Sequence, residues 1–308
     1  MMDKIDLKLL ANLCKDANIS NTRLAKTLGV NAATVAKRID EMVRDGLITI
    51  KAVPNSIKLG YKIKAVIVLK VDWINIDTIV AKLKENSNIL LMVTTFGRFD
   101  ILMIVDFSEW EKLNKFVKEE ITQCPGVKQI DVLFIDESKK MYRDIFRSSG
   151  EINLSTTPDD IDNKLIEELR ENGRASYTDL AHKMGVSQAT ISRRVSALLN
   201  NNLIKIIAIP NPSKFGCSAN AFILLGTEHT KADKICTELN SYPQVYGSMT
   251  LSFGFDILLY VQFKTTELLY EFVKEKISHI DGLSSIEILI VAEYLKTTYE
   301  SVDFECNI

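Results

Sequence analysis

The amino-acid sequence predicts an α+β protein in which a winged helix-turn-helix domain followed by a ferredoxin-like βαββαβ domain occurs twice. Three observations lead to this prediction. The chain repeats itself after 156 positions, each repeat begins with short amphipathic helical segments around a glycine turn, and each continues in the order strand, helix, strand, strand, helix, strand. A period this long indicates a duplicated multi-domain unit rather than a solenoid of small repeats.

The repeat keeps one register from end to end. Arg38 aligns with Arg194, a shift of 194 − 38 = 156 positions. The aligned segments include Gly29-Val30 with Gly185-Val186, Pro54-Asn55 with Pro210-Asn211, Asp100-Ile101-Leu102 with Asp256-Ile257-Leu258, and Phe116-Val117-Lys118-Glu119 with Phe272-Val273-Lys274-Glu275. We therefore expect the two repeats to share one domain order.

Each repeat opens with three predicted helices. In the first repeat, Ser20 and Asn31 are N-cap residues for the second and third helices, and Gly29 ends the second. Apolar positions fall on one face of the first helix (Ile5, Leu9, Leu10, Leu13) and of the third (Val35, Ile39, Met42, Val43). Residues 47–53 then predict a strand that ends at Pro54, which indicates a wing and a hinge into the next domain.

The second domain of the repeat alternates strands and helices. Its predicted elements are a strand at 62–71, a helix at 76–83, strands at 89–95 and 101–107, a helix at 110–121, and a strand at 127–135. The strand at 62–71 is apolar on both faces, because Ala65 and Ile67 alternate with Val66 and Val68. Helices cover only one face of such a sheet, so we expect a second sheet on the other, from the other repeat or from another subunit.

These patterns give the domain boundaries. We expect a helix-turn-helix domain at 1–55, a ferredoxin-like domain at 60–137, a linker at 138–158, a second helix-turn-helix domain at 159–211, and a second ferredoxin-like domain at 216–299.

Composition narrows the functional classes. Hydrophobic residues make up 46% and charged residues 25% of the chain, and the formal net charge is −2, so any DNA contact must come from a local basic patch. The start lacks the pattern of a signal peptide, and no apolar run reaches the length of a membrane span. The five cysteines show no metal-ligand spacing, and the three histidines lie on separate elements. Nucleotide-binding and hydrolase motifs are also missing from the sequence, so we expect no metal, cofactor or catalytic residues. From the start of the chain and the unpaired cysteines we expect a cytoplasmic protein.

The third helix of each repeat is the predicted DNA reader. In a helix-turn-helix, this helix enters the major groove and presents its outer face to base edges and phosphates. The candidate DNA-binding residues are Asn31, Thr34, Lys37, Arg38 and Arg44 in the first repeat, and Ser187, Gln188, Thr190, Arg193 and Arg194 in the second. Residues 1–53 carry 9 − 6 = +3 charges and residues 159–209 carry 7 − 7 = 0. The first domain is therefore expected to bind DNA more strongly, with the second relying on its arginine pair.

The sequence resembles the Lrp/AsnC (feast/famine) family of transcriptional regulators. The resemblance rests on the helix-turn-helix, the strand ending in Pro-Asn, and a βαββαβ domain with Gly97-Arg98-Phe99-Asp100 and Pro125-Gly126-Val127, and it covers nearly the whole chain twice. It implies pairing of the sheet domains, further assembly into homo-oligomers, binding to double-stranded DNA, and an amino acid or related small molecule as effector. The implied effector residues are Thr95, Gly97, Arg98, Asp100, Gly254 and Asp256.

This chain departs from the family pattern in three ways. It is a tandem fusion, Phe253 takes the place of Gly97 in the second turn, and Arg98 has no basic counterpart. The second effector pocket is therefore expected to be absent or to accept a different ligand. The strongest alternative is an enzyme, because siroheme decarboxylases resemble the same family and pair two related units. That alternative would require basic and His side chains around a tetrapyrrole, and the first repeat has no His.

Overall fold

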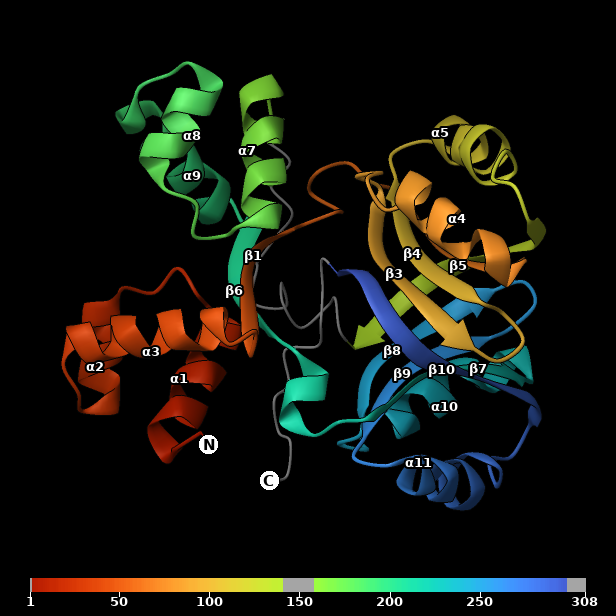
Figure 1. Ribbon diagram of the computed structural model, residues 1–308. Helices are drawn as coiled ribbons and strands as arrows, with labels where there is room; N and C mark the ends of the chain where they lie inside the picture. The colour runs from red at the N-terminus through yellow and green to blue at the C-terminus, as the bar shows by residue number, and fades with distance from the viewer. Residues whose placement is uncertain (1, 141–157, 298–308) are drawn as a thin grey trace. The chain divides into compact units, whose positions relative to one another are not determined.

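The computed structural model describes residues 2–140 and 158–297 (Figure 1). These residues form two compact units, and each unit takes one segment from each repeat: 2–59 with 158–215, and 60–140 with 216–297. Most of the expected linker falls in residues 141–157, outside the described residues.

One unit contains both helix-turn-helix domains. The first is built from α1 (Lys4–Lys15), α2 (Asn21–Leu28) and α3 (Ala32–Arg44), and the second from α7 (Asp160–Glu171), α8 (Tyr177–Met184) and α9 (Gln188–Asn200). As expected, Ser20 and Asn31 cap α2 and α3, and Gly29 ends α2 in the left-handed conformation. The described fold matches the predicted α+β class.

A two-stranded ribbon joins the two helix-turn-helix domains. The strand at the wing position, β1 (Ile48–Pro54), pairs antiparallel with its counterpart β6 (Ile204–Pro210) rather than ending in a free wing. Helix α1 packs on β6 and α7 packs on β1, so each strand contacts the first helix of the other repeat. One hydrophobic core runs through both domains. Helices α3 and α9, the two predicted recognition helices, therefore pack against one common core.

The other unit is a closed barrel of eight strands. In order around the barrel they are β10 (Leu283–Thr297), β3 (Ile89–Phe96), β4 (Ile101–Phe107), β2 (Ile63–Val71), β5 (Val127–Lys140), β8 (Val245–Ser252), β9 (Ile257–Phe263) and β7 (Ala219–Thr227). The main helical segments are α4 (Ile76–Leu83), α5 with η2 (Trp110–Ile121), α10 (Ala232–Leu239), and α11 with η5 (Thr266–Ile277). Two hydrophobic cores lie between the sheets and these helices.

The second sheet that the sequence requires comes from the same chain. Strand β5 first pairs with β2 of its own repeat and then with β8 of the other, and β10 likewise passes from β7 to β3. This second pairing explains why β5 continues to Lys140, beyond the predicted end at residue 135. Val66 and Val68, the apolar positions that helices leave uncovered, are fully buried.

The described residues do not meet the requirements for a membrane-spanning helix, a metal site or a disulfide. No helix in residues 2–140 and 158–297 is long and apolar enough to cross a membrane. Within the same ranges there is no group of three or more side chains that could hold a metal ion. The four described cysteines are buried free thiols, and burial raises the pKa of Cys14 to about 12.

Candidate DNA-binding helices and effector cavity

Two of the predicted DNA-binding side chains start the recognition helices. Asn31 Oδ1 accepts a hydrogen bond from the backbone N–H of Thr34 at 2.7 Å, and Ser187 Oγ accepts one from the N–H of Thr190 at 3.1 Å. The hydroxyls of Ser187 and Thr190 also lie 2.9 Å apart. These residues therefore fix the first turn of α3 and α9.

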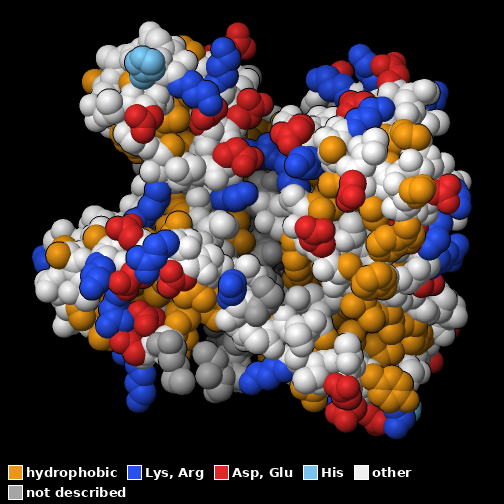
Figure 2. Space-filling view, viewed as in Figure 1, with side chains coloured by type: hydrophobic (Ala, Val, Ile, Leu, Met, Phe, Trp, Pro, Cys, Tyr) orange, Lys and Arg blue, Asp and Glu red, His pale blue; other side chains and the backbone are white. Residues whose placement is uncertain are grey.

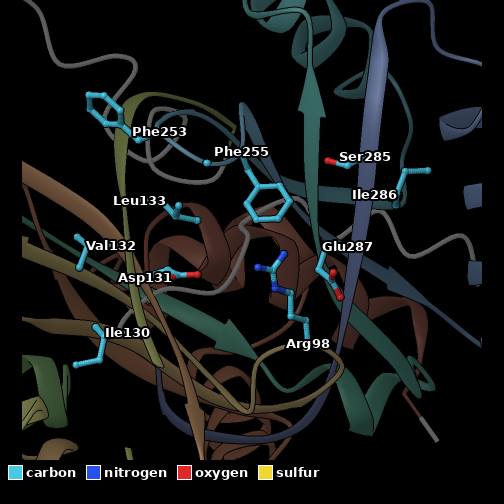
Figure 3. Close-up of a pocket in the computed structure, with 11 residues that line it drawn as sticks. Arg98, Ile130, Asp131, Val132, Leu133, Phe253, Phe255, Ser285, Ile286 and Glu287 are labelled. Atoms are coloured by element: carbon cyan, nitrogen blue, oxygen red, sulfur yellow. The ribbon is translucent and has the colours of Figure 1, made fainter. Parts of the chain in front are cut away.

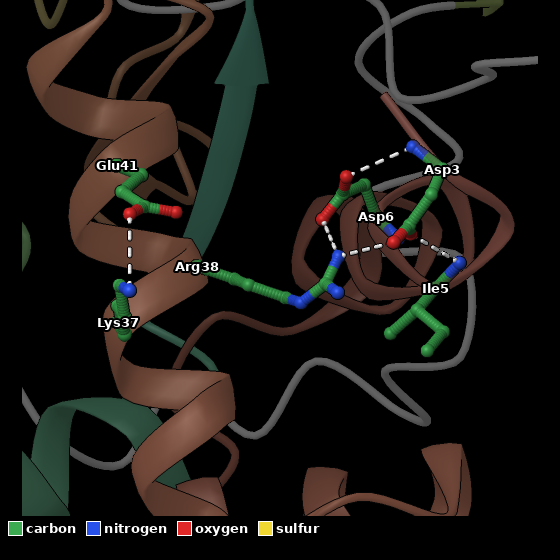
Figure 4. A network of polar contacts seen from close by, with 6 residues as sticks. All are labelled: Asp3, Ile5, Asp6, Lys37, Arg38 and Glu41. Atoms are coloured by element: carbon green, nitrogen blue, oxygen red, sulfur yellow. Dashed lines mark hydrogen bonds and ion pairs between the residues drawn. The ribbon is translucent and has the colours of Figure 1, made fainter. Parts of the chain in front are cut away.

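Arg38 is held inside the first domain. Its Nη1 donates to Asp3 Oδ2 at 2.8 Å and to Asp6 Oδ1 at 2.5 Å (Figure 4). Asp3 and Asp6 form the capping box of α1, so the arginine ties the recognition helix to the start of the first helix. The N–H of Asp6, followed by the Arg38 guanidinium, lowers the pKa of Asp3, and both carboxylates raise the pKa of Arg38.

The second repeat contains the same arrangement. Arg194 Nη1 donates to both oxygens of Asp159 and to Asp162 Oδ1, at 2.8–2.9 Å. Both arginines are predicted from the sequence to face DNA, because their position alone does not reveal the carboxylates of a neighbouring helix. The recurring Asp-x-x-Asp at 3–6 and 159–162 was the available signal for this structural role.

The remaining candidates lie on the surface. Lys37 is 77% exposed and its Nζ lies 3.9 Å from Glu41 Oε1 (Figure 4), while Arg44 contacts Asp45 at 3.1 Å. Gln188 and Arg193 are exposed on α9. These four side chains are available to an approaching duplex.

Asp100, a predicted effector residue, is a buried anchor of the first turn. Its carboxylate accepts hydrogen bonds from Lys70 Nζ at 2.8 Å, the Val71 N–H at 2.8 Å and Trp73 Nε1 at 3.0 Å. The hydroxyl of Thr95, which is also fully buried, donates to the Phe99 carbonyl at 2.9 Å. Thr95 and Asp100 therefore hold the β3–β4 turn against the end of β2.

Asp256 occupies the same position in the second turn with fewer partners. It accepts a hydrogen bond from the Thr227 N–H at 2.7 Å and lies 3.0 Å from His229 Nδ1. The Asp256 carboxylate raises the pKa of His229 above its ordinary value. His229 stands where the first repeat has Trp73, and Gly226 stands where it has Lys70.

A cavity of about 560 Å³ lies within the barrel unit, where both turns reach the strands of the opposite repeat. Its wall combines Arg98 of the first turn, residues 253–255 of the second turn, residues 130–133 of β5 and residues 285–287 of β10. In Figure 3 the Arg98 side chain extends toward the space between Asp131 and Glu287, beside the ring of Phe255. Arg98 and Gly254 thus border a single site.

The cavity is built from equivalent positions of the two repeats. Asp131 corresponds to Glu287 (287 − 131 = 156), and Arg98 corresponds to Gly254 (254 − 98 = 156). The two acidic residues are not among the predicted effector residues, although their recurrence at the same register of the repeat is a usable signal. The cavity therefore carries two carboxylates and one guanidinium, on an otherwise mostly apolar wall.

Gly97 allows the first turn to approach β10. Its φ is +149°, and a Cβ placed on it would lie 2.6 Å from the Ile288 carbonyl oxygen. Phe253, its counterpart, adopts a φ of +69° and its side chain is exposed. Close packing against β10 thus requires a glycine at this position.

Four family models match successive parts of the chain. They describe a winged helix-turn-helix DNA-binding domain at 2–49, a PF0864 C-terminal dimeric alpha+beta barrel domain at 62–146, an AsnC-type helix-turn-helix domain at 159–199, and an Lrp/AsnC ligand binding domain at 220–301. Their order repeats the domain order of the structure.

Curated relatives resemble half of the chain at a time. An HTH-type transcriptional regulator of Pyrococcus horikoshii is 32% identical over 145 residues, which is 47% of this chain and 92% of that protein. The HTH-type transcriptional regulator Ptr1 of Methanocaldococcus jannaschii is 32% identical over 136 residues, or 44% of this chain and 92% of that protein.

Solved structures match the whole tandem arrangement. The siroheme decarboxylase NirDL covers 97% of this chain and 94% of its own, with a TM-score of 0.64 and 16% sequence identity. The same enzyme in complex with an iron-uroporphyrin III analogue gives a TM-score of 0.65, also at 16% identity. At this identity the likeness shows a shared fold. Together with the family models and the relatives, it shows that the chain belongs to the Lrp/AsnC family, as a tandem of two helix-turn-helix and ligand-binding units.

Proposed function

We propose that this protein is a sequence-specific DNA-binding transcriptional regulator that responds to an amino acid or related small molecule. The observation that carries the proposal is the pair of N-capped recognition helices on one common core, each with exposed side chains of types that contact phosphates or bases. Because the core is shared, the two helices would meet DNA as a fixed pair, which suits an operator with two unequal half-sites.

The cavity supplies the effector part of the proposal. Arg98 is suited to a ligand carboxylate, and Asp131 and Glu287 are suited to a ligand ammonium group, while Phe255 and Leu133 offer apolar contacts. A zwitterionic amino acid carries both charged groups on the same carbon atom. The effector residues of this proposal are therefore Arg98, Gly254, Asp131 and Glu287, with Thr95, Gly97, Asp100 and Asp256 shaping the turns.

DNA binding is tested by selecting duplexes from a random pool with the full chain and measuring their dissociation constants over a range of salt concentrations. A regulator should enrich a defined sequence, and its affinity should fall with increasing salt. Absence of enrichment at every salt concentration would contradict the DNA-binding part.

Effector binding is tested by calorimetric titration with a panel of amino acids. Arg98→Ala should abolish the binding seen with the wild type. Lys115→Ala is the matched control, since Lys115 is 70% exposed on α5 and lies outside the cavity wall. If no amino acid binds, or if binding survives Arg98→Ala, the effector part fails.

Further assembly would use the outer surface of the barrel unit, because each repeat already covers the inner sheet face of the other. The exposed aromatic side chains of the barrel unit include the stacked pair Trp73 and Phe96, whose ring centroids are 5.7 Å apart. We expect chains to associate through this surface. Phe96→Glu should lower the mass measured by sedimentation velocity, and an unchanged mass would exclude this surface.

An enzyme is the second candidate, favoured by the fold shared with siroheme decarboxylase over nearly the whole chain. Uroporphyrin-type tetrapyrroles carry many carboxylates, whereas the cavity offers a single guanidinium and two carboxylates. This charge set opposes a polyanionic ligand. Titration with an iron tetrapyrrole, followed by absorbance, separates the candidates: a regulator should give no shift of the tetrapyrrole band, and a saturable shift would favour the enzyme.

A further inference from the structure

The two recognition helices present different chemistry at equivalent positions. Near the start of α9, Gln188 and Ser192 are exposed, and their counterparts on α3 are Ala32 and Ala36 (188 − 32 = 192 − 36 = 156). Alanine offers no hydrogen bond to a base edge. Glutamine and arginine are the side chains that pair bidentately with adenine and guanine, and α9 carries Gln188 beside Arg193.

The second halves of the helices differ in charge. On α3, Asp40 is exposed and Glu41 is 41% exposed, and the counterparts on α9 are Ser196 and Ala197. Figure 2 shows acidic and basic side chains intermixed over the first helix-turn-helix domain. Residues 188–200 contain no Asp or Glu at all. An acid on the outer face of a recognition helix repels the phosphates that flank the groove.

The ion pairs strengthen this difference. Arg38 and Arg194 are left out of this count because they are bound to the capping boxes. The remaining charged side chains of α3 are Lys37, Arg44, Asp40 and Glu41, which give a net charge of 2 − 2 = 0. The remaining charged side chain of α9 is Arg193, which gives a net charge of +1. Within the described part of the chain, no carboxylate forms an ion pair with Arg193, whereas Lys37 lies 3.9 Å from Glu41. Arg193 is therefore the less compensated cation.

The charge surplus of the first domain lies elsewhere. Its +3 depends on basic residues outside α3, including Arg23 and Lys26, which are exposed on α2. In a helix-turn-helix, the helix before the reader crosses the DNA backbone. These cations are placed for phosphates rather than for base edges.

We propose that the two domains divide the work of DNA recognition: α9 reads the bases through Gln188 and Arg193, and the first domain supplies mainly phosphate contacts. This inference rests on the proposed DNA-binding function. The net charge of each whole domain predicts only that the first domain binds DNA more strongly. The proposal adds that base recognition belongs mainly to the second domain.

The test uses the full chain and the duplex enriched by selection, with a scrambled duplex of the same composition as reference. Arg193→Ala and Gln188→Ala should each reduce the ratio of specific to nonspecific affinity about tenfold or more. Arg23→Ala and Lys26→Ala should weaken both affinities alike and reduce the salt slope by about one for each phosphate that is no longer neutralised. Lys37→Ala, at the position matching Arg193, should leave the ratio within about twofold.

A charge exchange between the helices provides the reciprocal test. Ser196→Asp with Ala197→Glu should give α9 the acidic face of α3 and remove sequence-specific binding. Asp40→Ser with Glu41→Ala should strengthen binding to both duplexes. All these side chains are at least partly exposed, so circular dichroism should show unchanged folding.

Two results would overturn the division of labour. One is an affinity ratio that survives both Arg193→Ala and Gln188→Ala, and the other is a Lys37→Ala effect on the ratio as large as that of Arg193→Ala. Failure of the wild type to enrich any duplex would instead remove the DNA-binding function itself, and the inference with it. The selection step therefore separates the two failures.

Discussion

Replacing Asp100 by Ala should destabilise the barrel much more than replacing Asp256, although the two residues occupy equivalent positions. Asp100 receives three hydrogen bonds and its side chain is 3% exposed, whereas Asp256 receives one backbone hydrogen bond, contacts His229 and is 19% exposed. The difference between the unfolding free energies of the two variants measures how much burial adds to the stability that a carboxylate contributes at this position.

The magnitude follows from the donors left behind. In Asp100→Ala the Val71 N–H, on a residue that is 3% exposed, loses its partner at a cost of about 1–3 kcal/mol. The donors on Lys70 and Trp73, residues that are roughly half exposed, can turn to water and add about 1 kcal/mol together. The total is about 3 kcal/mol. In Asp256→Ala, Thr227 is half-buried and His229 is 76% exposed, so about 1 kcal/mol is expected.

Urea unfolding of the full chain, followed by tryptophan fluorescence, measures both values. The two tryptophans, Trp73 and Trp110, lie in the barrel unit, so the signal reports on that unit. The midpoint should shift clearly further for Asp100→Ala than for Asp256→Ala, with an unchanged slope. Equal shifts, or an unchanged midpoint for Asp100→Ala combined with loss of amino-acid binding, would refute the anchoring role and return Asp100 to the effector site.

Three further outcomes are expected. Gly97→Ala should lower the unfolding free energy of the barrel by about 2–4 kcal/mol, since the new Cβ meets the Ile288 carbonyl. Gly29→Ala should lower the unfolding free energy by only about 1–2 kcal/mol, because a Cβ there has nothing within 4 Å and the cost comes from the left-handed backbone alone. Because Asp256 raises the pKa of His229, their ion pair should be complete below the ordinary histidine pKa and should be lost as the pH rises through the raised value. NMR titration of His229 measures this pKa, and a midpoint at the ordinary histidine value would contradict the prediction. Arg38→Gln should lower the thermal midpoint at neutral pH, and its effect should be smaller at a pH below the lowered pKa of Asp3, where the wild type has lost the Arg38–Asp3 ion pair; calorimetry at both pH values tests this, and an equal effect at both would contradict it.

The local elements could be predicted because their signals are local. Capping residues, glycine turns and apolar periodicity placed the helices and strands of the first repeat within a few residues of those observed, apart from the extension of β5. The pairing of β1 with β6 was not accessible, because a seven-residue apolar strand next to Pro54 gives the same pattern as a wing. Which strand covers a sheet is decided by contacts far apart in sequence.

For the candidate site, the sequence indicated the types of side chain better than it indicated where they lie. Arg98 and Gly254 border the cavity, but Asp100 and Thr95 are hidden beneath the turn, and their acidic or polar character alone could not distinguish a ligand contact from a buried anchor. The same ambiguity applies to Arg38 and Arg194, whose partners lie more than thirty positions earlier in the sequence. Side-chain type identifies what a residue can bind, and packing decides what it does bind.

The ribbon of β1 and β6 also constrains the order of folding. Ile48 pairs with Pro210, so the first helix-turn-helix domain cannot complete its sheet until more than two hundred residues have been synthesised. Strand β3 must likewise wait for β10, near residue 290. During translation the amino-terminal half would therefore expose an unpaired strand and part of its apolar core, and exposed strand edges and apolar surface of this kind favour aggregation.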